Sequence, residues 1–382
     1  MRLFSYKRLS ALFGVILISI LIAACGNSGS GSTGSPSGSG TTASTKAGQG
    51  CKKVGVLLPE TASSARWDSQ DKPLLTQGIQ TALGSGVTVD YNNAGGDPTV
   101  QQTQAQADLT KGDCILVVAA SDSSSAATIV SQAKAKNVPV IAYDRLIQSK
   151  DLSYYVSFDN VKVGQLQGQY IADHYKSYTQ SSNNIVMING SQTDNNALLF
   201  KQGATSVIQP LISSGALKSV YNQFTPNWDN DQARVEMDGA LTANQNKVAV
   251  AYVANDGMAN SVIAALKTKK LNGKVLVTGQ DATVAGIHNI LAGDQSMTVY
   301  KAITKEVNAT VSLVKALSAG TDTSSLTNGA TVKTSDETAI PSILETPVSV
   351  DKTNIASTVI AEGFVTKSAV CAGIPAGTDG VC

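Results

Sequence analysis

Short apolar runs alternate with helical patterns along most of the chain after Lys52. The first half contains the apolar runs KKVGVLL, VTVDYN, CILVVAA and PVIAYD, and the alternation resumes after Asn160 with IVMIN, SVYNQF, VAVAYVA and KVLVTG. Strands that are apolar throughout and that alternate with helices are typical of a parallel sheet covered on both faces. The pattern therefore predicts an α/β fold with doubly wound parallel sheets.

The alternating region is too long for one sheet of ordinary size, so we expect two lobes. The series breaks near residues 157–160 and 298–301, where we expect the chain to cross between the lobes. Two α/β lobes joined by several crossings form a hinge that can close. The predicted boundaries are 51–158 plus 300–340 for the N-terminal lobe, 159–299 plus 341–370 for the C-terminal lobe, and 371–382 for a tail.

The N-terminal segment is typical of an export signal. Basic residues precede an apolar stretch from Ala11 to Ala24, which is shorter than the ~20 residues of a spanning helix. The stretch ends in LIAAC, which resembles a bacterial lipobox and predicts a lipid on Cys25 after removal of the signal in residues 1–25. An ordinary secretory signal with an incidental Cys25 is the alternative. We expect the Gly/Ser-rich residues 26–50 to form a flexible tether that anchors an exported protein to the outer face of the cell membrane.

Four further cysteines form an even set in an exported chain, which favours disulfides. Cys51 precedes the first strand and Cys114 begins the third, and these strands are neighbours in a doubly wound sheet. Cys371 and Cys382 bracket a short Gly/Pro-rich tail. We predict the pairs Cys51–Cys114 and Cys371–Cys382. A zinc site is disfavoured because the CxxC spacing is absent.

Charge and composition exclude several function classes. The 382 residues include 29 basic and 28 acidic residues, so the net charge of +1 gives no footprint for nucleic acid. Only His174 and His288 could contribute imidazoles to a metal site or a catalytic triad. We expect no metal, no cofactor and no enzymatic activity, since no acid/base pair or nucleophile stands out.

Several predicted strands end in amides and carboxylates. In an open parallel sheet the ligand lies outside the carboxyl ends of the strands. Such polar groups, without a metal or nucleophile pattern, are what a polyhydroxylated small molecule needs, and a sugar also needs aromatic rings against its C–H faces. Trp67 and Trp228, the only tryptophans, lie beside polar residues in loops after strands, where stacking on a ligand is favoured over core packing.

Each polar candidate also has a structural alternative. Asp144 and Arg145 could form a local surface ion pair of little energetic value. Asp194, with Asn195 and Asn196, Asn255 with Asp256, and Asp281 precede helices, and Asp and Asn are favoured N-caps worth ~1 kcal/mol each. Lys301 could be a solvated lysine. The collection of such sites on one side of a sheet favours a pocket.

An ordered set of segments resembles the periplasmic D-xylose-binding proteins of the type I two-lobed class that serves ABC importers. The segments are VPVIAYDRLI, YYVSFDNVKVGQLQG, GSQTDNNALLF, LTANQNKV, VTGQDA and AGDQSMTVYKAIT, and the resemblance runs from about residue 52 to residue 364. It implies that two tryptophans sandwich a sugar ring. The implied binding residues are Arg66, Trp67, Asp144, Arg145, Asp194, Asn196, Trp228, Asn255, Asp281 and Lys301.

The resemblance implies a monomeric substrate-binding lipoprotein that captures a monosaccharide, most favourably D-xylose, and delivers it to an ABC permease with a separate ATPase. The first loop, LLPETASSARW, departs from this pattern and looks more like that of binders of glucose and galactose. Discrimination of one hydroxymethyl group amounts to only ~1–3 kcal/mol. A receptor for chemotaxis or a sensor kinase is a further alternative. A regulator of the lactose-repressor type lacks support, because a signal stands where its DNA-binding segment would be.

Overall fold

The computed structural model describes residues 46–382. The predicted signal segment, the lipidation of Cys25 and the tether up to residue 45 lie outside the described residues. The last five residues of the predicted tether are not a free linker, which corrects its boundary. Gly48 is buried beside Pro139 and Leu317, and the Gly50 amide donates to the Ser318 carbonyl at 2.8 Å. These contacts attach residues 46–50 to the N-terminal lobe.

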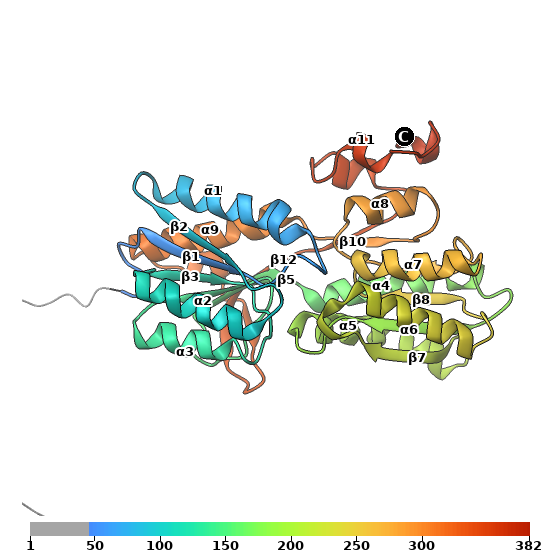
Figure 1. Ribbon diagram of the computed structural model, residues 1–382, viewed down its shortest axis with the longest axis horizontal. Helices are drawn as coiled ribbons and strands as arrows, with labels where there is room; N and C mark the ends of the chain where they lie inside the picture. Colours follow the sequence, from blue (N-terminus) through green and yellow to red (C-terminus); the bar gives the residue numbers. More distant parts are fainter. Residues whose placement is uncertain (1–45) are drawn as a thin grey trace, which may run out of the picture. The chain divides into compact units, whose positions relative to one another are not determined.

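The N-terminal lobe is built on a seven-stranded sheet in the order β11-β12-β5-β4-β3-β1-β2, in which only β11 is antiparallel to its neighbour (Figure 1). One face packs against α1 and α9, and the other packs against α2 and α3. Both faces are therefore covered, as the continuous apolar strands predict. The elements are β1 (Lys53–Leu58), η1 (Trp67–Asp71), α1 (Lys72–Leu83), β2 (Thr88–Asn93), α2 (Pro98–Lys111), β3 (Ile115–Val118), α3 (Ala127–Ala135), β4 (Val140–Tyr143), β5 (Tyr154–Phe158), α9 (Ile303–Ala319), α10 (Ser324–Thr327), β11 (Thr331–Lys333) and β12 (Ala339–Glu345).

The C-terminal lobe contains a four-stranded parallel sheet in the order β7-β6-β8-β9, with its own apolar core. A smaller core lies around α8, β10 and the C-terminal tail. The main elements are α4 (Asn160–His174), η2 (Tyr175–Ser177), β6 (Asn184–Asn189), α5 (Asn195–Ser213), β7 (Lys218–Phe224), η3 (Pro226–Trp228), α6 (Asn230–Ala243), β8 (Val250–Val253), α7 (Asp256–Thr268), β9 (Leu276–Val277) and α8 (Val284–Leu291). The remaining elements are β10 (Thr298–Tyr300), β13 (Val348–Val350), η4 (Ala356–Ile360), α11 (Lys367–Val370) and η5 (Thr378–Gly380), and β10 pairs antiparallel with β13.

Within residues 46–382 the chain passes three times between the two lobes. The passages from β5 to α4 and from β10 to α9 coincide with the predicted crossings. The third differs from the prediction, because the expected boundary between residues 340 and 341 falls inside β12. Ser342 to Glu345 of that strand pair in parallel with Tyr155 to Phe158 of β5, so the crossing lies between β12 and β13.

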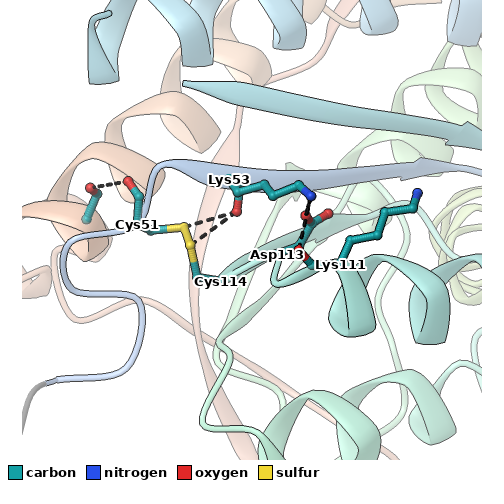
Figure 2. Close-up of a disulfide and its surroundings, with 6 residues drawn as sticks. Cys51, Lys53, Lys111, Asp113 and Cys114 are labelled. Atoms are coloured by element: carbon teal, nitrogen blue, oxygen red, sulfur yellow. Dashed lines mark hydrogen bonds and ion pairs between the residues drawn. A yellow bond between two sulfur atoms is a disulfide. The ribbon is translucent and has the colours of Figure 1, made fainter. Parts of the chain in front are cut away.

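Both predicted disulfides are present. Cys51–Cys114 joins the residues that flank the paired strands β1 and β3 (Figure 2), and Cys371–Cys382 closes the tail. In each pair the Cα atoms lie 5.5 Å apart. Within residues 46–382, no helix has the length and apolar character needed to cross a membrane.

Candidate functional site

A pocket lies where the carboxyl ends of the strands of both lobes face one another. Its cavity has a volume of about 30 Å³, which exceeds the ~10–15 Å³ that one water molecule needs. All ten sequence-predicted residues line it, together with four that the sequence reasoning missed. The lining residues are Ser63, Ser64, Arg66, Trp67, Asp144, Arg145, Asp194, Asn196, Phe200, Trp228, Asn255, Gln280, Asp281 and Lys301.

Arg66 is fixed by carboxylates of the N-terminal lobe. Its Nε and Nη2 donate to the two oxygens of Asp71 at 2.9 and 2.7 Å, and Nη2 also donates to Glu306 at 3.0 Å. Tyr143 Oη donates to the same Asp71 carboxylate at 2.5 Å. The paired geometry with Asp71 is the bidentate arrangement that orients a guanidinium most strongly. The orientation of the Arg66 guanidinium in the pocket is therefore determined by side chains of its own lobe.

Asp144 is the charged centre of the pocket. Its Oδ2 accepts from Arg66 Nη1 at 2.9 Å and from Lys301 Nζ at 3.1 Å. Burial alone raises the pKa of Asp144, but the charges of Lys301, Arg66 and Arg145 outweigh burial and hold the pKa below its usual range. Asp144 therefore stays ionised. Lys301 is 4% exposed, so the alternative of a solvated lysine is wrong.

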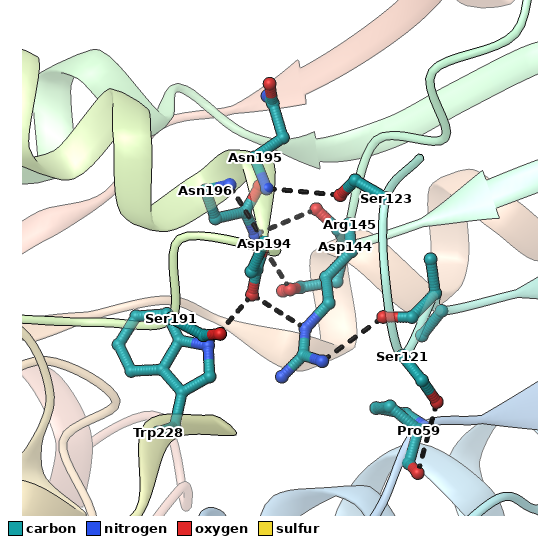
Figure 3. Close-up of polar contacts among 12 residues, drawn as sticks. Pro59, Ser121, Ser123, Asp144, Arg145, Ser191, Asp194, Asn195, Asn196 and Trp228 are labelled. Carbon is teal, nitrogen blue, oxygen red and sulfur yellow. Dashed lines mark hydrogen bonds and ion pairs between the residues drawn. The ribbon is translucent and has the colours of Figure 1, made fainter. Parts of the chain in front are cut away.

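Arg145 and Asn196 each contact the opposite lobe across the pocket (Figure 3). Arg145 Nε lies 2.9 Å from Asp194 Oδ2, and Asn196 Nδ2 donates to the Asp144 carbonyl and to its carboxylate, both at 3.0 Å. Asp144 and Arg145 thus pair with other residues instead of forming the local surface pair considered above. Since each contact joins a strand end of one lobe to the start of α5 in the other, both depend on lobe closure.

The two tryptophans lie in the pocket and are almost fully buried. The guanidinium carbons of Arg66 and Arg145 lie 4.5 and 5.3 Å from the centroid of the Trp67 ring, within cation–π range. Trp228 Nε1 donates to Asp194 Oδ2 at 3.1 Å. The Trp228 ring packs against the backbone of Gly190, where a Cβ would lie only 2.1 Å from Cη2. Gly190 therefore permits this ring position.

Asp194 and Asn255 cap helices and line the pocket at the same time. Asp194 Oδ1 accepts from the Asn196 amide at 2.9 Å, and Asn255 Oδ1 accepts from the Met258 amide at 3.0 Å. Capping and pocket formation are therefore compatible at these positions. Burial raises the pKa of Asp194, and the positive charge of Arg145 only partly opposes this shift. Burial likewise raises the pKa of Asp281, with partial opposition from the charge of Lys301.

Three pocket residues have a left-handed backbone. The φ angles are 59° at Asp144, 56° at Trp228 and 100° at Asp281. Such conformations are uncommon for non-glycine residues and cluster at functional sites, where the surrounding structure enforces them. Here the enforced backbone turns place the three side chains in the wall of the cavity.

The four residues that sequence reasoning missed carried weak signals. Ser63 and Ser64 belong to the first loop, and Gln280 lies beside Asp281 in the quoted GQDA segment. Phe200 lies in α5, one turn after Asn196, and its ring centroid is 6.3 Å from that of Trp228. Helical spacing from Asn196 could have identified Phe200 as a neighbour of the pocket.

The chain is similar to proteins of known function over most of its length. The family described as periplasmic binding protein domain matches residues 54–322. The D-xylose-binding periplasmic protein of Haemophilus influenzae is 36% identical, over 83% of this chain and 92% of the relative. The multiple sugar-binding periplasmic receptor ChvE of Rhizobium radiobacter is also 36% identical, over 81% and 90%. A solved ABC transporter solute-binding protein from Clostridium phytofermentans with bound β-D-glucose is 31% identical, with a TM-score of 0.73 over 84% of this chain and all of that chain.

Proposed function

The chain belongs to the periplasmic binding protein domain family, and we propose that it is the substrate-binding component of an ABC importer for a monosaccharide. One observation carries the proposal. Trp67 and Trp228 come from different lobes and line one pocket whose remaining wall consists mostly of carboxylates, amides and fixed cations. Hydroxyl groups both donate and accept hydrogen bonds, so this mixed wall suits a neutral polyol, and the rings suit its C–H faces.

The pocket residues divide the work of recognition. Arg66, Arg145 and Lys301 are expected to donate to hydroxyl oxygens, and Asp144, Asp194 and Asp281 to accept from hydroxyl protons. Asn255 is expected to donate through its Nδ2, because its Oδ1 already accepts from the Met258 amide. Asn196 already donates to Asp144 and accepts from Asn160, so it is expected to hold Asp144 in position. A ligand that contacts both lobes stabilises the closed form by its differential affinity for that form.

D-xylose is the proposed sugar, with glucose and galactose as the alternative. Relatives named as D-xylose-binding and as multiple sugar-binding proteins are similarly related to the chain, at 36% identity. Among the solved structures, the ligand of the similar solute-binding protein is β-D-glucose. The departure of the first loop from the xylose-binding pattern favours tests of hexoses beside pentoses.

Calorimetric titration of the purified chain with pentoses and hexoses tests the proposal. Saturable one-to-one binding of a monosaccharide is expected, and Asn255→Asp and Trp228→Ala should weaken it while thermal unfolding remains cooperative. The matched control is Asn272→Ala, because this amide pairs with Asp294 outside the pocket. The proposal is abandoned if no pentose or hexose binds at millimolar concentration.

We further propose that lipid on Cys25 holds the protein at the outer face of the cell membrane, as a monomer beside its permease. The support is the lipobox-like LIAAC followed by the Gly/Ser-rich segment. Metabolic labelling with a fatty-acid analogue should label the wild-type protein and leave Cys25→Ser unlabelled. Equal labelling of both would contradict the anchor without affecting the sugar site.

A further inference from the structure

Three carboxylates converge at the amino ends of strands in the N-terminal lobe, at the sheet edge opposite the sugar pocket. Asp90 lies in β2, Asp108 in α2, and Asp113 in the connection from α2 to β3. One oxygen from each lies within 4.8 Å of the others. The Cys51–Cys114 disulfide flanks β1 and β3 at the same edge (Figure 2).

The Asp113 carboxylate is buried and unsatisfied. Asp113 is 2% exposed, and within residues 46–382 neither of its oxygens receives a hydrogen bond. Asp90 Oδ2 is likewise buried without a hydrogen-bond donor. A buried carboxylate that no hydrogen-bond donor satisfies is costly unless a cation compensates it. Lys53 lies within ion-pair distance of Asp90 and Asp113 but donates no hydrogen bond to these oxygens, which therefore remain available to a ligand.

Two lysines lie near the cluster but do not satisfy Asp113. Lys53 Nζ lies 3.4 Å from Asp90 Oδ2 and 3.7 Å from Asp113 Oδ1, both beyond the ~2.7–2.9 Å of a charge-assisted hydrogen bond. It donates instead to the Lys111 carbonyl, and Lys111 Nζ contacts Asp108 at 3.2 Å. The side chains of Lys53 and Lys111 are 31% and 53% exposed, so both can move toward solvent.

We propose that Asp90, Asp108 and Asp113 form a binding site for a hard divalent cation, with calcium as the preferred ion. All three ligands are carboxylate oxygens, which suit calcium or magnesium and not zinc. Calcium accepts irregular sets of six to eight oxygens, and the partly exposed side of Asp90 leaves room for water to complete the shell. Asn92, whose Nδ2 donates to Asp108 at 2.7 Å, would supply a carbonyl oxygen after rotation of its amide.

The backbone makes room for this cluster at Gly55 of β1. A Cβ there would lie 2.9 Å from Asp113 Oδ2 and 3.3 Å from Asp108 Oδ2, closer than ordinary contacts. The carboxylates therefore sit directly over the strand. A cation at this point would join β2, α2 and the entry to β3, and so stabilise the edge that the disulfide already constrains.

Thermal unfolding of the oxidised, chelator-treated protein with and without about 1 mM calcium, within the range of extracellular calcium sites, tests the inference. Calcium should raise the wild-type midpoint by roughly 3 °C or more, as expected when an ion binds only the folded state. Asp113→Asn should abolish this rise. The matched control Asp238→Asn changes an exposed carboxylate that pairs with Arg234, and it should keep the full rise.

Asp90→Asn provides a second variant. Position 90 should tolerate the substitution, because the Asp90 side chain is 23% exposed. This variant should weaken calcium binding in calorimetry at least tenfold, whereas Lys53→Gln should strengthen it by removing a competing cation. The inference is overturned if calcium leaves the wild-type midpoint unchanged or if Asp90→Asn binds calcium as the wild type does. These measurements need no sugar, so their outcome is independent of the proposed transport function.

Discussion

Gly190→Ala should disable ligand binding without removing any group that contacts the ligand. Gly190 follows β6, and it does not line the cavity, whereas Trp228 does. A Cβ at residue 190 would lie 2.1, 2.3 and 2.4 Å from Cη2, Cζ3 and Cζ2 of the Trp228 ring. Non-bonded carbon atoms prefer ~3.5–4.0 Å. The ring must therefore move by roughly 1.4 Å or more, and we expect it to move toward the cavity.

The expected loss of affinity follows from what the ring would give up. Overpacking of this kind costs typically ~1–3 kcal/mol. Displacement also lengthens the hydrogen bond from Trp228 Nε1 to Asp194, which is 3.1 Å long. If this overpacking destabilises the closed, liganded form by 1–3 kcal/mol relative to the free form, affinity decreases roughly 5- to 150-fold, because each 1.4 kcal/mol is a factor of ten.

Calorimetric titration with the best-bound monosaccharide measures this effect, and circular dichroism with thermal unfolding checks the fold. Gly239→Ala is the matched control, because residue 239 lies inside α6 with nothing within 4 Å of a Cβ. It should keep wild-type affinity and gain stability, by roughly 0.5–1 kcal/mol, from the better helix propensity of alanine. Wild-type affinity in Gly190→Ala would refute the claim that the position of the Trp228 ring determines binding.

Three further experiments address the charges and the cross-link. A double-mutant cycle of Arg145→Ala and Asp194→Ala, measured on sugar affinity, should give a coupling energy of roughly 0.5–3 kcal/mol, because the 2.9 Å contact between the two side chains joins the lobes. Additive losses of affinity would contradict a shared role of the two residues in closure. Burial raises the pKa of Asp256 to about 7, so the folded state holds a proton that the unfolded chain, with a pKa of ~3.9, releases. The resulting stabilisation is complete below the unfolded pKa and is lost as pH rises through 7. In urea titrations at several pH values, Asp256→Asn should remove a fall in the free energy of unfolding of at most ~1.4 kcal/mol per pH unit, and an unchanged pH dependence would count against Asp256 as its cause. Replacement of Cys51 and Cys114 by alanine should cost roughly 4 kcal/mol, given the sequence separation of 63 residues, and unchanged chemical stability would contradict the loop-entropy estimate.

The sequence predicted the sheets well because a strand buried on both faces has a distinctive local pattern. β3 and β8 are fully buried along their length, and each was recognisable as an apolar run. β12 gave no such signal, since its exposed and buried residues alternate and its partner β5 lies far away in the sequence. The assignment of β12 to a lobe depends on long-range pairing, which local composition does not encode. Residues 46–50 were misassigned for a similar reason, because their packing depends on distant residues such as Leu317.

The sequence identified the members of the pocket but not how they pair. Asp144 and Arg145 are adjacent, so a mutual ion pair was a reasonable alternative from local spacing. In the structure Asp144 instead contacts Arg66 and Lys301, and Arg145 contacts Asp194. The left-handed backbone at Asp144 turns its side chain away from that of Arg145. This backbone conformation is imposed by the tertiary structure and not by the local sequence. The acidic cluster at the opposite edge was missed because its members are 18 and 5 residues apart, without a motif.

The arrangement of charges explains why a neutral ligand can bind among so many ionised groups. Each cation in the pocket already faces a carboxylate, as Arg66 faces Asp71 and Asp144, so binding does not require an unpaired charge to be buried. Charged groups held in this way make stronger hydrogen bonds to hydroxyls than neutral groups do. Arg66 is also oriented by Asp71 and Glu306 of its own lobe, so its orientation does not depend on lobe closure, which lowers the entropy cost of binding. Loss of one member would leave its partner buried and unpaired, and the resulting affinity loss would therefore overstate that residue's own contact with the sugar.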